Sequence, residues 1–437
     1  MINLSKKLAA FSAGLTLEDV PVEAIANGKL AILDCLGVSV LAVSDEVGQA
    51  VLRLARKESW QGPCTIWGSA SRASARDAAF ANATLAHALD YDDGGHVTTY
   101  ILAASASLAE RGSIPGRTLL EAFIAGREVR MSLDPLFANR FAGVGPGARG
   151  WHANGILGPI AAACAAGKIL PLDVAQMLNA IGLAAGSCGA LGRDGGTMAK
   201  PFRAGHAALT GVTCALLAQD GFTADTEALE GPYGLLSALA PVDQEVVNSL
   251  AQNLGVEFSL AKHAVKAKKF AAANATHAPV EAMLRLLQKN RLSAAEVARI
   301  ECDLKPYPLL RLSPENGHEG KFSMAYCLAV ALLQGRLNPE DFGAATANKR
   351  ELKDLIRSVH HRPGGKSLIV ILKTGEQIVE PVQPIRDLQT WDEVVYKFHA
   401  CASQVFTDSQ RASIIDHVAN LEKLPSVKSL TEALKTR

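Results

Sequence analysis

Apolar, alanine-rich stretches without strand alternation follow one another through the first 265 residues of the chain. The stretches 156–169 and 207–220, for example, are apolar on almost every side when placed on a helix, and helices of this kind are buried. Only 5% of the 437 residues are aromatic, whereas 37 are glycine, so small side chains must provide much of the packing. The sequence therefore predicts a thick, layered all-helical domain.

The pattern changes after residue 265. Residues 297–304 alternate between apolar and charged side chains, which is typical of a half-buried strand. Residues 366–382 have the pattern of a β-hairpin with a Thr-Gly turn. Helices are expected at 278–289 and 322–333, so this part of the chain is predicted to be an α+β unit.

The C-terminal tail is predicted to be helical again, at 391–402 and 409–421. We therefore expect a mainly α fold with a large, discontinuous all-α domain made of residues 1–265 and 395–437. A smaller α+β domain of residues 266–394 is expected to be inserted between the two parts.

Charge and cysteine usage limit the possible partners. Lys and Arg number 44 against 43 Asp and Glu, so nothing attracts the chain as a whole to nucleic acid or to an acidic membrane. The eight cysteines are scattered, without a CxxC motif or zinc-ligand spacing, and we expect no metal and no cofactor. A cytoplasmic location is expected, because no signal cleavage site is obvious and the longest uncharged run, 174–192, suits a buried helix and its loop.

The most unusual stretch is HALDYDDGGHVTT at 87–99. An alanine-rich helix over 73–89 should end there, and another apolar helix should begin near Ile101. The break between them holds three carboxylates, two glycines and an imidazole: Asp90, Asp92, Asp93, Gly94, Gly95 and His96. A loop held by rigid helices is a favoured place for a functional site. The alternative is a helix–loop–helix corner whose aspartates cap the second helix.

Three later segments place cationic groups near the beginning of an apolar helix. They contain His152; Lys200, Arg203 and His206; and Lys268, Lys269 and His277. Cations are unfavourable at a helix N-terminus unless an anion joins them. If the segments converge, they form a positive pocket for a di- or tricarboxylate. Taken singly, His152, His277 and Lys268 are more simply explained as solvated or core side chains, whereas the cluster from Lys200 to His206 favours a function.

Several motifs, in this order, resemble the MmgE/PrpD family, which includes 2-methylcitrate dehydratase, cis-aconitate decarboxylase and iminodisuccinate epimerase. They are LDYDDGGH, GWHANGILGP, KPFRAGHAALTGV, KKFAAANATHAPVEAM and KFSMAYCLAVALLQGRL. The resemblance covers most of the chain, and its sharpest motif is KPF-x-AGHAA. It implies a large all-α domain formed by the N-terminal part and the C-terminal tail, an inserted α+β lid domain and a homodimer.

The resemblance also implies site residues. Asp90, Asp92 and Asp93 match the helix-ending Asp-x-Asp-Asp segment of the family, and His96 matches the active-site histidine that follows it. The later motifs add His152, Lys200, Lys268 and His277, and Tyr326 falls where many members have tyrosine.

Two departures from the family pattern fall in the expected substrate pocket. Gly94 stands where members often have Thr or Ser, and the loop before His96 is several residues shorter. A Tyr-Pro-Ser-Cys-like run is replaced by Phe-Ala-Ala-Ala at 270–273, which is expected to widen the pocket. Both departures are expected to change the substrate rather than the fold, and we expect poor activity on cis-aconitate.

The reactions of the family make or break a bond at the carbon α or β to a carboxylate. The negative charge that develops needs preorganised positive groups or hydrogen-bond donors, and histidine is a suitable acid or base near neutral pH. The predicted catalytic residues are His96, His152, Lys200 and Asp93, with Asp93 orienting or tuning a cationic partner. The predicted substrate-binding residues are Asp90, Arg203, His206, Lys268, His277 and Tyr326.

The sequence therefore predicts a cofactor-independent lyase, of the dehydratase or decarboxylase type, that acts on a small di- or tricarboxylic acid. Two alternatives stay open. One is an epimerase or isomerase that uses the same proton transfers on a small dicarboxylate. The other is a catalytically degenerate family member that only binds ligands or partners.

Overall fold

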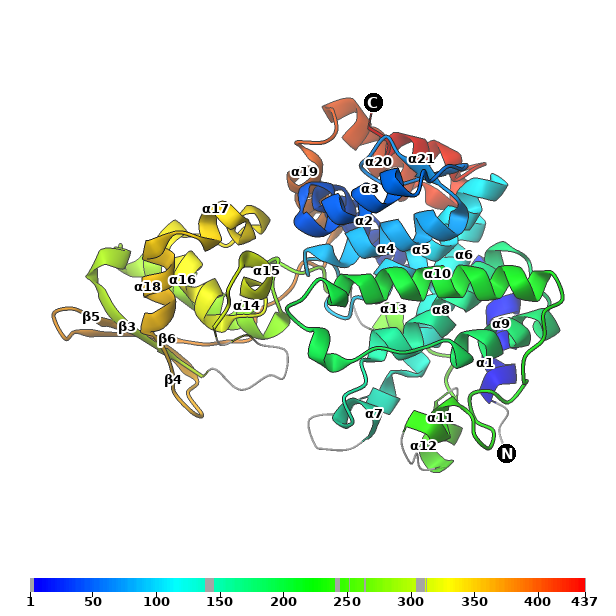
Figure 1. Cartoon of the computed structure of the whole chain (residues 1–437), viewed down its shortest axis with the longest axis horizontal. Coiled ribbons are helices and arrows are strands. Elements are labelled where there is room, and N and C mark those ends of the chain that lie inside the picture. The colour runs from blue at the N-terminus through cyan, green and yellow to red at the C-terminus, as the bar shows by residue number, and fades with distance from the viewer. Residues whose placement is uncertain are drawn as a thin grey trace.

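The computed structural model describes residues 4–137, 145–239, 244–250, 252–262, 265–303, 311 and 313–436. Figure 1 shows two units that lie side by side, a large helical unit and a smaller unit with a sheet. The predicted mainly α fold is confirmed. Each unit has its own apolar core: one core takes residues from Leu4 to Ala267 and from Val394 to Leu434, and the other from Phe270 to Val370.

The large unit consists of helices from both ends of the chain. The long helices of its first part are α1 (Leu4–Gly14), α2 (Val22–Leu41), α3 (Glu46–Lys57), α4 (Ala75–Ala88), α5 (Val97–Gly112), α6 (Gly116–Ser132), α8 (Ala153–Ile169), α9 (Val174–Gly186) and α10 (Ala199–Gln219). Shorter elements are β1 (Cys64–Thr65), β2 (Arg72–Ala73), α7 (Gly145–Ala148), α11 (Leu235–Leu239), α12 (Gln244–Ser249) and α13 (Ser259–Lys262). The tail adds α19 (Trp391–Ala402), α20 (Asp408–Ala419) and α21 (Lys428–Ala433).

Glycine allows the central helices of this unit to approach closely. A β-carbon at Gly205 of α10 would lie 2.1 Å from Thr84 Oγ1 of α4, and one at Gly211 would lie 2.5 Å from the β-carbon of Ala162 in α8. Both distances are far below van der Waals contact, so α10 can lie between α4 and α8 only with glycine at these positions. This close packing brings the N-terminal end of α10 next to the C-terminal end of α4.

The helix α2 is a core helix despite its composition. Together with the turn that follows it, Val22–Ser44 has the length and hydropathy of a membrane span, but 72% of its most apolar window is buried inside the fold. Such burial is typical of the core helix of a globular domain.

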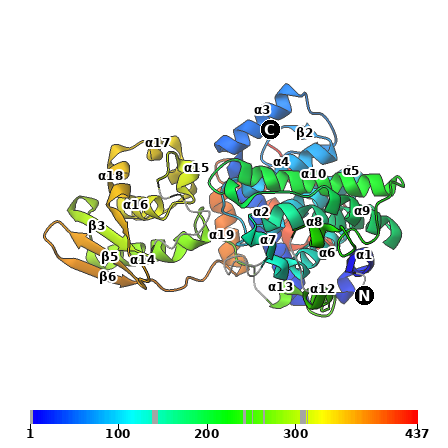
Figure 2. The ribbon, with the colours of Figure 1, turned by 60° about the horizontal axis from the view of Figure 1, so that its bottom comes forward.

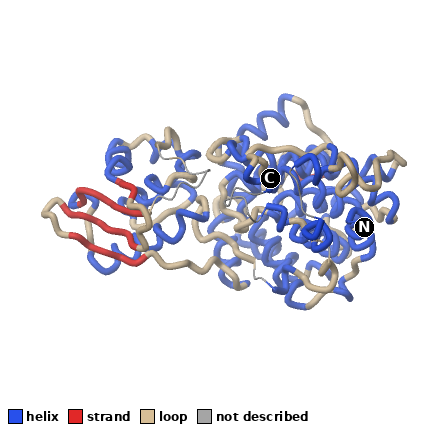
Figure 3. The backbone as a smooth tube through the Cα atoms, turned by 90° about the horizontal axis from the view of Figure 1, so that it is seen from below, coloured by secondary structure: helices blue, strands red, loops and turns tan. Residues whose placement is uncertain are grey.

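The smaller unit is a four-stranded sheet packed against helices. Its elements are α14 (Asn274–Asn290), β3 (Val297–Cys302), α15 (Gly317–Gly320), α16 (Met324–Gln334), α17 (Ala344–Ala347), α18 (Arg350–Ser358), β4 (Val359–His361), β5 (Ser367–Leu372) and β6 (Gln377–Pro381). The strand order is β4-β3-β5-β6, with β3 parallel to β4 and antiparallel to β5. Figure 3 shows this sheet at the end of the molecule away from the helical unit.

The predicted strands occur where the sequence patterns indicated. Strands β5 and β6 form the expected hairpin, with Ile369 opposite Val379 and Gly375 in the turn at a φ of 91°. In β3, Ile300 and Cys302 are buried, as the alternation required. Leu304, the last residue of the predicted alternating stretch, lies outside the described residues.

Both chain crossings between the units pass beside one loop of the helical unit. Ala267, on the way out, forms isolated antiparallel bridges with Asp93 and with Leu388, which lies on the way back. The loop that holds Asp93 therefore lies at the junction of the two units.

Candidate active site

The loop between α4 and α5 has an unusual backbone. Asp90 has a φ of 51° and His96, the N-cap residue of α5, a φ of 58°. Left-handed conformations are uncommon for residues other than glycine, and they cluster at functional sites where the surroundings fix them. Contacts with the smaller unit hold the loop: the Gly94 amide donates to Lys266 O at 3.0 Å, and Asn274 Nδ2 donates to Gly94 O at 3.0 Å.

Asp93 caps helix α5. Its Oδ1 accepts from the amides of Gly95 and Val97 at 3.1 Å, and its Oδ2 accepts from Thr98 and from Arg127 Nη1 at 3.2 Å. Asp93 is not among the residues that line the cavity described below. Asp93 thus caps the second helix, as the alternative interpretation of this loop proposed for its aspartates, and it pairs with a cation, Arg127; its predicted catalytic role stays a prediction.

Asp90 is the centre of the polar cluster. It is buried, its Oδ1 contacts Lys200 Nζ, and its Oδ2 accepts from Lys268 Nζ at 2.7 Å. His96 Nε2 lies 3.2 Å from Asp90 Oδ1. Burial alone would raise the pKa of Asp90, but the charges of Lys200 and Lys268 outweigh burial and hold this pKa well below its usual range. Asp90 is therefore an anion that holds two lysines together.

His96 is oriented by a second carboxylate. Its Nδ1 lies 2.8 Å from Oδ1 of the fully buried Asp92, and its Nε2 lies 3.2 Å from Lys200 Nζ. Burial opposes ionisation of Asp92, but the contacts with His96 and His87 lower its pKa below the usual range. Both ring nitrogens of His96 therefore face an ionised carboxylate, Asp92 at Nδ1 and Asp90 at Nε2, and Nε2 is also within proton-transfer distance of Lys200.

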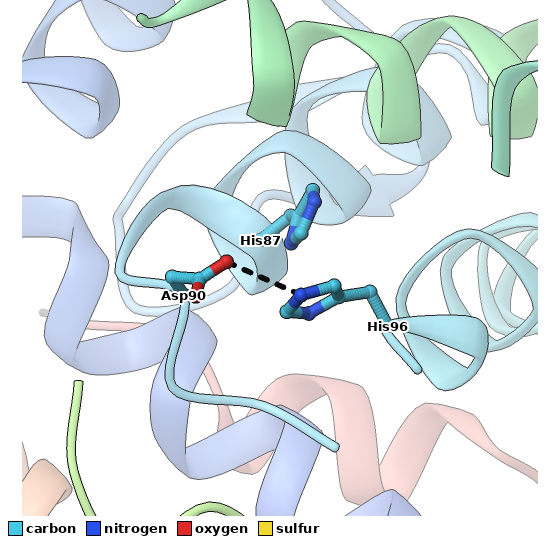
Figure 4. A group of neighbouring side chains, drawn as sticks. All are labelled: His87, Asp90 and His96. Atoms are coloured by element: carbon cyan, nitrogen blue, oxygen red, sulfur yellow. Dashed lines mark ion pairs between the residues drawn. The ribbon is translucent and has the colours of Figure 1, made fainter. Parts of the chain in front are cut away.

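His87 is a member of this cluster that the predicted site omitted. Its ring lies 4.1 Å from the ring of His96, centroid to centroid, on the last turn of α4. Figure 4 shows His87, Asp90 and His96 turned toward one another. Burial, together with the charges of Lys200 and His96, lowers the pKa of His87 to about 3, so this imidazole is neutral. The helical spacing of His87 before Asp90 was the signal that could have identified it.

The donor atoms of His87, Asp90 and His96 lie within 4.8 Å of one another, as in a metal site. Two ammonium groups already contact Asp90, however. A divalent cation at this position would be repelled by both lysines, so the charge of the cluster suits an anion better.

A cavity of about 390 Å³ opens beside the cluster, at the junction of the two units. Asp90, His96, His152, Lys200 and Lys268 all line it. This volume is in the range of small-molecule sites. The structure thus brings together residues from four segments that are far apart in the sequence.

Four long helices begin at this cavity. The lining residues include the N-cap residues of α5 and α8 (His96 and His152), the second residue of α10 (Lys200) and the first residue of α14 (Asn274). Helix N-termini carry partial positive charge and unpaired amides, and both attract anions. Helix dipoles and lysines therefore give the cavity an electrostatic preference for an anionic ligand.

Lys200 is a buried amine whose protonation state can change near neutral pH. It is buried, its Nζ lies 5.0 Å from the ring centre of Phe322, and it contacts Asp90 and His96. Burial lowers its pKa to about 8; Lys268 adds to this shift, and Asp90 opposes it. An amine with this pKa can gain or lose a proton near neutral pH.

His152 is a neutral hydrogen-bonding group at the wall of the cavity. Burial, with the charges of Arg203 and Lys200, lowers its pKa well below the usual range. Its Nδ1 accepts from the amide of Asn154 at 3.3 Å, at the beginning of α8. A neutral imidazole held in this way carries its proton on Nε2 and can donate it in a hydrogen bond to a ligand.

Arg130 and Asn154 complete the wall, and the predicted site included neither. Arg130 Nη2 donates to Asn154 Oδ1 at 3.3 Å, and Arg130 Nη1 donates to Asp134 Oδ1 at 2.8 Å. Two of the five donors of the guanidinium are then still available to a ligand, since Nε donates to Tyr100. Helix α6 also carries Arg117, Glu121, Arg127 and Glu128, so nothing in the sequence marked Arg130 as a residue of the cavity wall.

Comparison with known proteins identifies the family. Residues 6–247 match the MmgE/PrpD N-terminal domain, and residues 270–423 match the MmgE/PrpD C-terminal domain. The chain belongs to the MmgE/PrpD family. This confirms the resemblance inferred from the motifs, and the chain is accordingly an enzyme of the lyase type found in this family.

Relatives of this MmgE/PrpD member align over almost their whole length. It is 26% identical to a cis-aconitate decarboxylase of Mus musculus, over 99% of this chain and 93% of the relative. The identity to the cis-aconitate decarboxylase of Homo sapiens is also 26%, over 99% and 95% of the two chains. A cis-aconitate decarboxylase of Aspergillus terreus is 24% identical over 99% and 96%.

Two predicted binding residues on α10 lie away from the cavity lining. Arg203 is buried, its Nη1 donates to Leu191 O at 2.9 Å, and its charge helps to lower the pKa of His152. His206 follows Lys200 by six residues, which turns it to another face of the helix, where its ring lies 6.0 Å from that of Phe202. The structure does not support the predicted substrate-binding role of either residue.

The predicted residues His277 and Tyr326 are also absent from the cavity lining. His277 Nε2 lies 3.0 Å from Ala272 O, and burial lowers the pKa of this histidine to about 4. The Tyr326 hydroxyl donates to Asp341 O at 2.8 Å, and its ring stacks on Phe342. Both side chains have hydrogen-bond partners within the smaller unit and lie outside the described lining of the cavity, so this geometry gives their predicted substrate-binding role no support.

The departures from the family pattern affect the cavity unequally. Gly94 lines it, as expected. Of the three alanines expected to widen it, only Ala273 does so, because Ala271 and Ala272 are buried in the core of the smaller unit. The change at Gly94 is therefore the more important one for the substrate.

Proposed function

We propose that this protein is a lyase that acts on a small di- or tricarboxylic acid by acid–base chemistry of its own lysines and histidines. The observation that carries the proposal is the charge of the cavity. Lys200, Lys268 and Arg130 meet there with the beginnings of four helices, and the described residues of the lining include two carboxylates, Asp90 and Asp134. A ligand with two or three carboxylates complements this arrangement.

The contacts favour a different role for each residue of the site. Lys200 and His96 form the proton-transfer pair, because their nitrogens are 3.2 Å apart and Lys200 titrates near neutral pH. Asp92 orients the His96 ring through Nδ1, so that Nε2 faces Lys200 and Asp90. Asp90 keeps both lysines in place and separates their charges.

Binding and stabilisation of charge fall to the remaining groups. Removal of a proton or of carbon dioxide next to a carboxylate leaves negative charge on that carboxylate. Lys268 and the free donors of Arg130 are suited to hold substrate carboxylates, and Nε2–H of His152 is suited to donate to the oxygen where charge develops. These donors are fixed by the fold before the substrate arrives, which makes them effective.

The relatives favour decarboxylation or dehydration over a purely binding role, since three of them are named cis-aconitate decarboxylases. We propose a lyase reaction on a polycarboxylate that differs in shape from cis-aconitate, because Gly94 leaves space and removes a hydroxyl from the cavity.

The test is a panel of small acids followed by proton NMR. The purified protein is incubated with cis-aconitate, citrate, 2-methylcitrate and iminodisuccinate, with the Lys200→Met variant as the control. Release of carbon dioxide or formation of an olefin by the unaltered protein alone supports the proposal. Inversion of a stereocentre without loss of a group would replace it with an epimerase, and no reaction with any acid would contradict it.

A further inference from the structure

Three buried lysines converge on the C-terminal end of α4 and the residues that follow it. Lys321 Nζ donates to Ala88 O at 3.2 Å, Lys268 Nζ donates to Asp90 O at 3.0 Å, and Lys397 Nζ donates to Tyr91 O at 2.6 Å. Each lysine is at most 3% exposed. Carbonyls at a helix C-terminus lack partners within the helix and carry partial negative charge. Lys321 therefore neutralises the end of α4, whereas Lys268 and Lys397 bind the carbonyls of Asp90 and Tyr91 in the loop that follows it.

The lysines come from three different parts of the chain. Lys268 lies just after the first crossing between the units, Lys321 precedes α16 in the smaller unit, and Lys397 belongs to α19 of the tail. Figures 1 and 2 both show α19 at the boundary between the units. The backbone that carries Asp90 is thus held at once from the smaller unit and from the tail.

Lys397 has a second buried partner and no contact with the cavity. Its Nζ lies 2.7 Å from Oδ1 of Asp34 in α2 and 3.8 Å from the ring centre of Tyr91. Burial raises the pKa of Asp34 to about 6 despite this pair. Buried ion pairs add little net stability, because removing both charges from water is costly; fixing one geometry is a better-supported role. Lys321 likewise lies 3.3 Å from Asp45 Oδ2.

We propose that Lys321 and Lys397 are positioning residues of the active site. They fix the backbone from Ala88 to Tyr91 so that Asp90 presents one oxygen to Lys200 and the other to Lys268. Lys321 comes from the smaller unit and Lys397 from the tail. The geometry of the proton-transfer pair therefore depends on the positions of the smaller unit and the tail relative to α4. This inference rests on the proposed function, since it assigns these residues to that same site.

The test uses variants that keep the buried charge balanced. Lys397→Met alone would leave Asp34 as an unpaired buried carboxylate, which is strongly destabilising, so Asp34→Asn is combined with it. Lys321→Met is made separately. The control is Lys289→Met, which removes a cation from the surface of the smaller unit, where the side chain is 62% exposed. Thermal unfolding and circular dichroism confirm that each variant is folded.

Two measurements follow on the folded variants. Amide hydrogen exchange at residues 89–97 is expected to be about tenfold faster in the double variant and in Lys321→Met, and unchanged in the control. With the acid that the unaltered protein converts, kcat is expected to fall about tenfold to a hundredfold, with KM changed by less than about threefold. The expected change is larger in kcat than in KM because neither Lys321 nor Lys397 lines the cavity in which the substrate binds.

Unchanged kcat in a folded double variant overturns the proposal, even if exchange rises. A fall in kcat that is accompanied by an equally large rise in KM also overturns it, because that result indicates a general disruption of the site. If the unaltered protein converts no acid, the proposed function fails, and hydrogen exchange alone then decides: faster exchange supports the positioning role, and unchanged exchange rejects it.

Discussion

The cavity and the smaller unit both contain buried polar side chains but use them differently. At the cavity, Lys200, His96 and Asp90 contact one another and face an opening of about 390 Å³. In the smaller unit, His277 and Tyr326 each end on a backbone carbonyl. Buried polar groups are normally satisfied, so these two side chains are ordinary. Donors and acceptors that face a cavity and can exchange protons, rather than residue types, mark the site.

The largest expected effect is that of Lys200→Met. This change removes the amine that contacts His96 Nε2 and keeps the length of the side chain. General acid–base groups contribute about 10²- to 10⁴-fold to rates, and we expect kcat/KM to fall about a thousandfold. Steady-state assays with the converted acid measure this, with the exposed Lys289→Met as the control. A loss below about tenfold would remove Lys200 from the proton-transfer pair.

The pH dependence of the cavity should follow Lys200. Burial lowers its pKa to about 8, so the ammonium predominates below that pH and the neutral amine above it. Because the Lys200 charge adds to those of Lys268 and Arg130 in attracting an anionic ligand, the affinity for citrate should fall above pH 8, by at most about tenfold per pH unit. Calorimetric titrations between pH 6.5 and about 9.5 test this, and an affinity that rises above pH 8 would contradict it.

Activity on cis-aconitate is expected to be low, below about 1 s⁻¹. Gly94 cannot donate a hydrogen bond from its side chain, and nearby hydroxyls do not replace it: Thr98 Oγ1 bonds Asp93, and Thr99 Oγ1 donates to His96 O at 3.0 Å. One hydrogen bond to a charged group is worth about 1.5–3 kcal/mol. The Gly94→Ser variant should therefore form itaconate about tenfold faster, as followed by NMR.

Space allows this substitution. A β-carbon at Gly94 would lie 3.3 Å from Asn274 Nδ2, which requires a shift of only a few tenths of an ångström. Fast conversion of cis-aconitate by the unaltered protein would show that another group supplies the missing hydrogen bond.

The smallest effects on activity are expected from substitutions of Tyr326 and His277 in the smaller unit. Tyr326→Phe leaves Asp341 O without its partner and should lower stability by about 1 kcal/mol, and His277→Gln should also act on stability. Both variants should keep kcat/KM within about threefold of the unaltered value, because neither side chain lines the cavity. Thermal unfolding and the same assays measure these effects. A hundredfold loss of kcat in folded Tyr326→Phe would contradict the claim that the cavity residues, and not Tyr326, carry the activity.

The sequence was sufficient to predict the helical class and three of the four strands of the smaller unit, because apolar periodicity carries this information, but it missed the short strand β4. The helix starts were less predictable: α5 was expected near Ile101 but begins at Val97, and the side chain of its N-cap residue, His96, does not cap its first turn. The sequence could not separate Asp90 from Asp93, since which of them caps α5 depends on the left-handed turns at Asp90 and His96. It also could not show that Tyr326 is satisfied by Asp341 O or that Arg130 lines the wall, because both depend on tertiary packing.

The most direct test of the central claim is deuterium uptake from D₂O into the panel of small acids, followed by NMR. If Lys200 and His96 transfer protons next to a carboxylate, a decarboxylation leaves deuterium on the carbon that loses carbon dioxide, and a dehydration leaves it in the remaining acid by exchange before water is lost. Lys200→Met should abolish the uptake, and Tyr326→Phe should leave it unchanged. Uptake that persists in folded Lys200→Met, or no uptake into any acid, would contradict the claim that this cavity is a polycarboxylate lyase site.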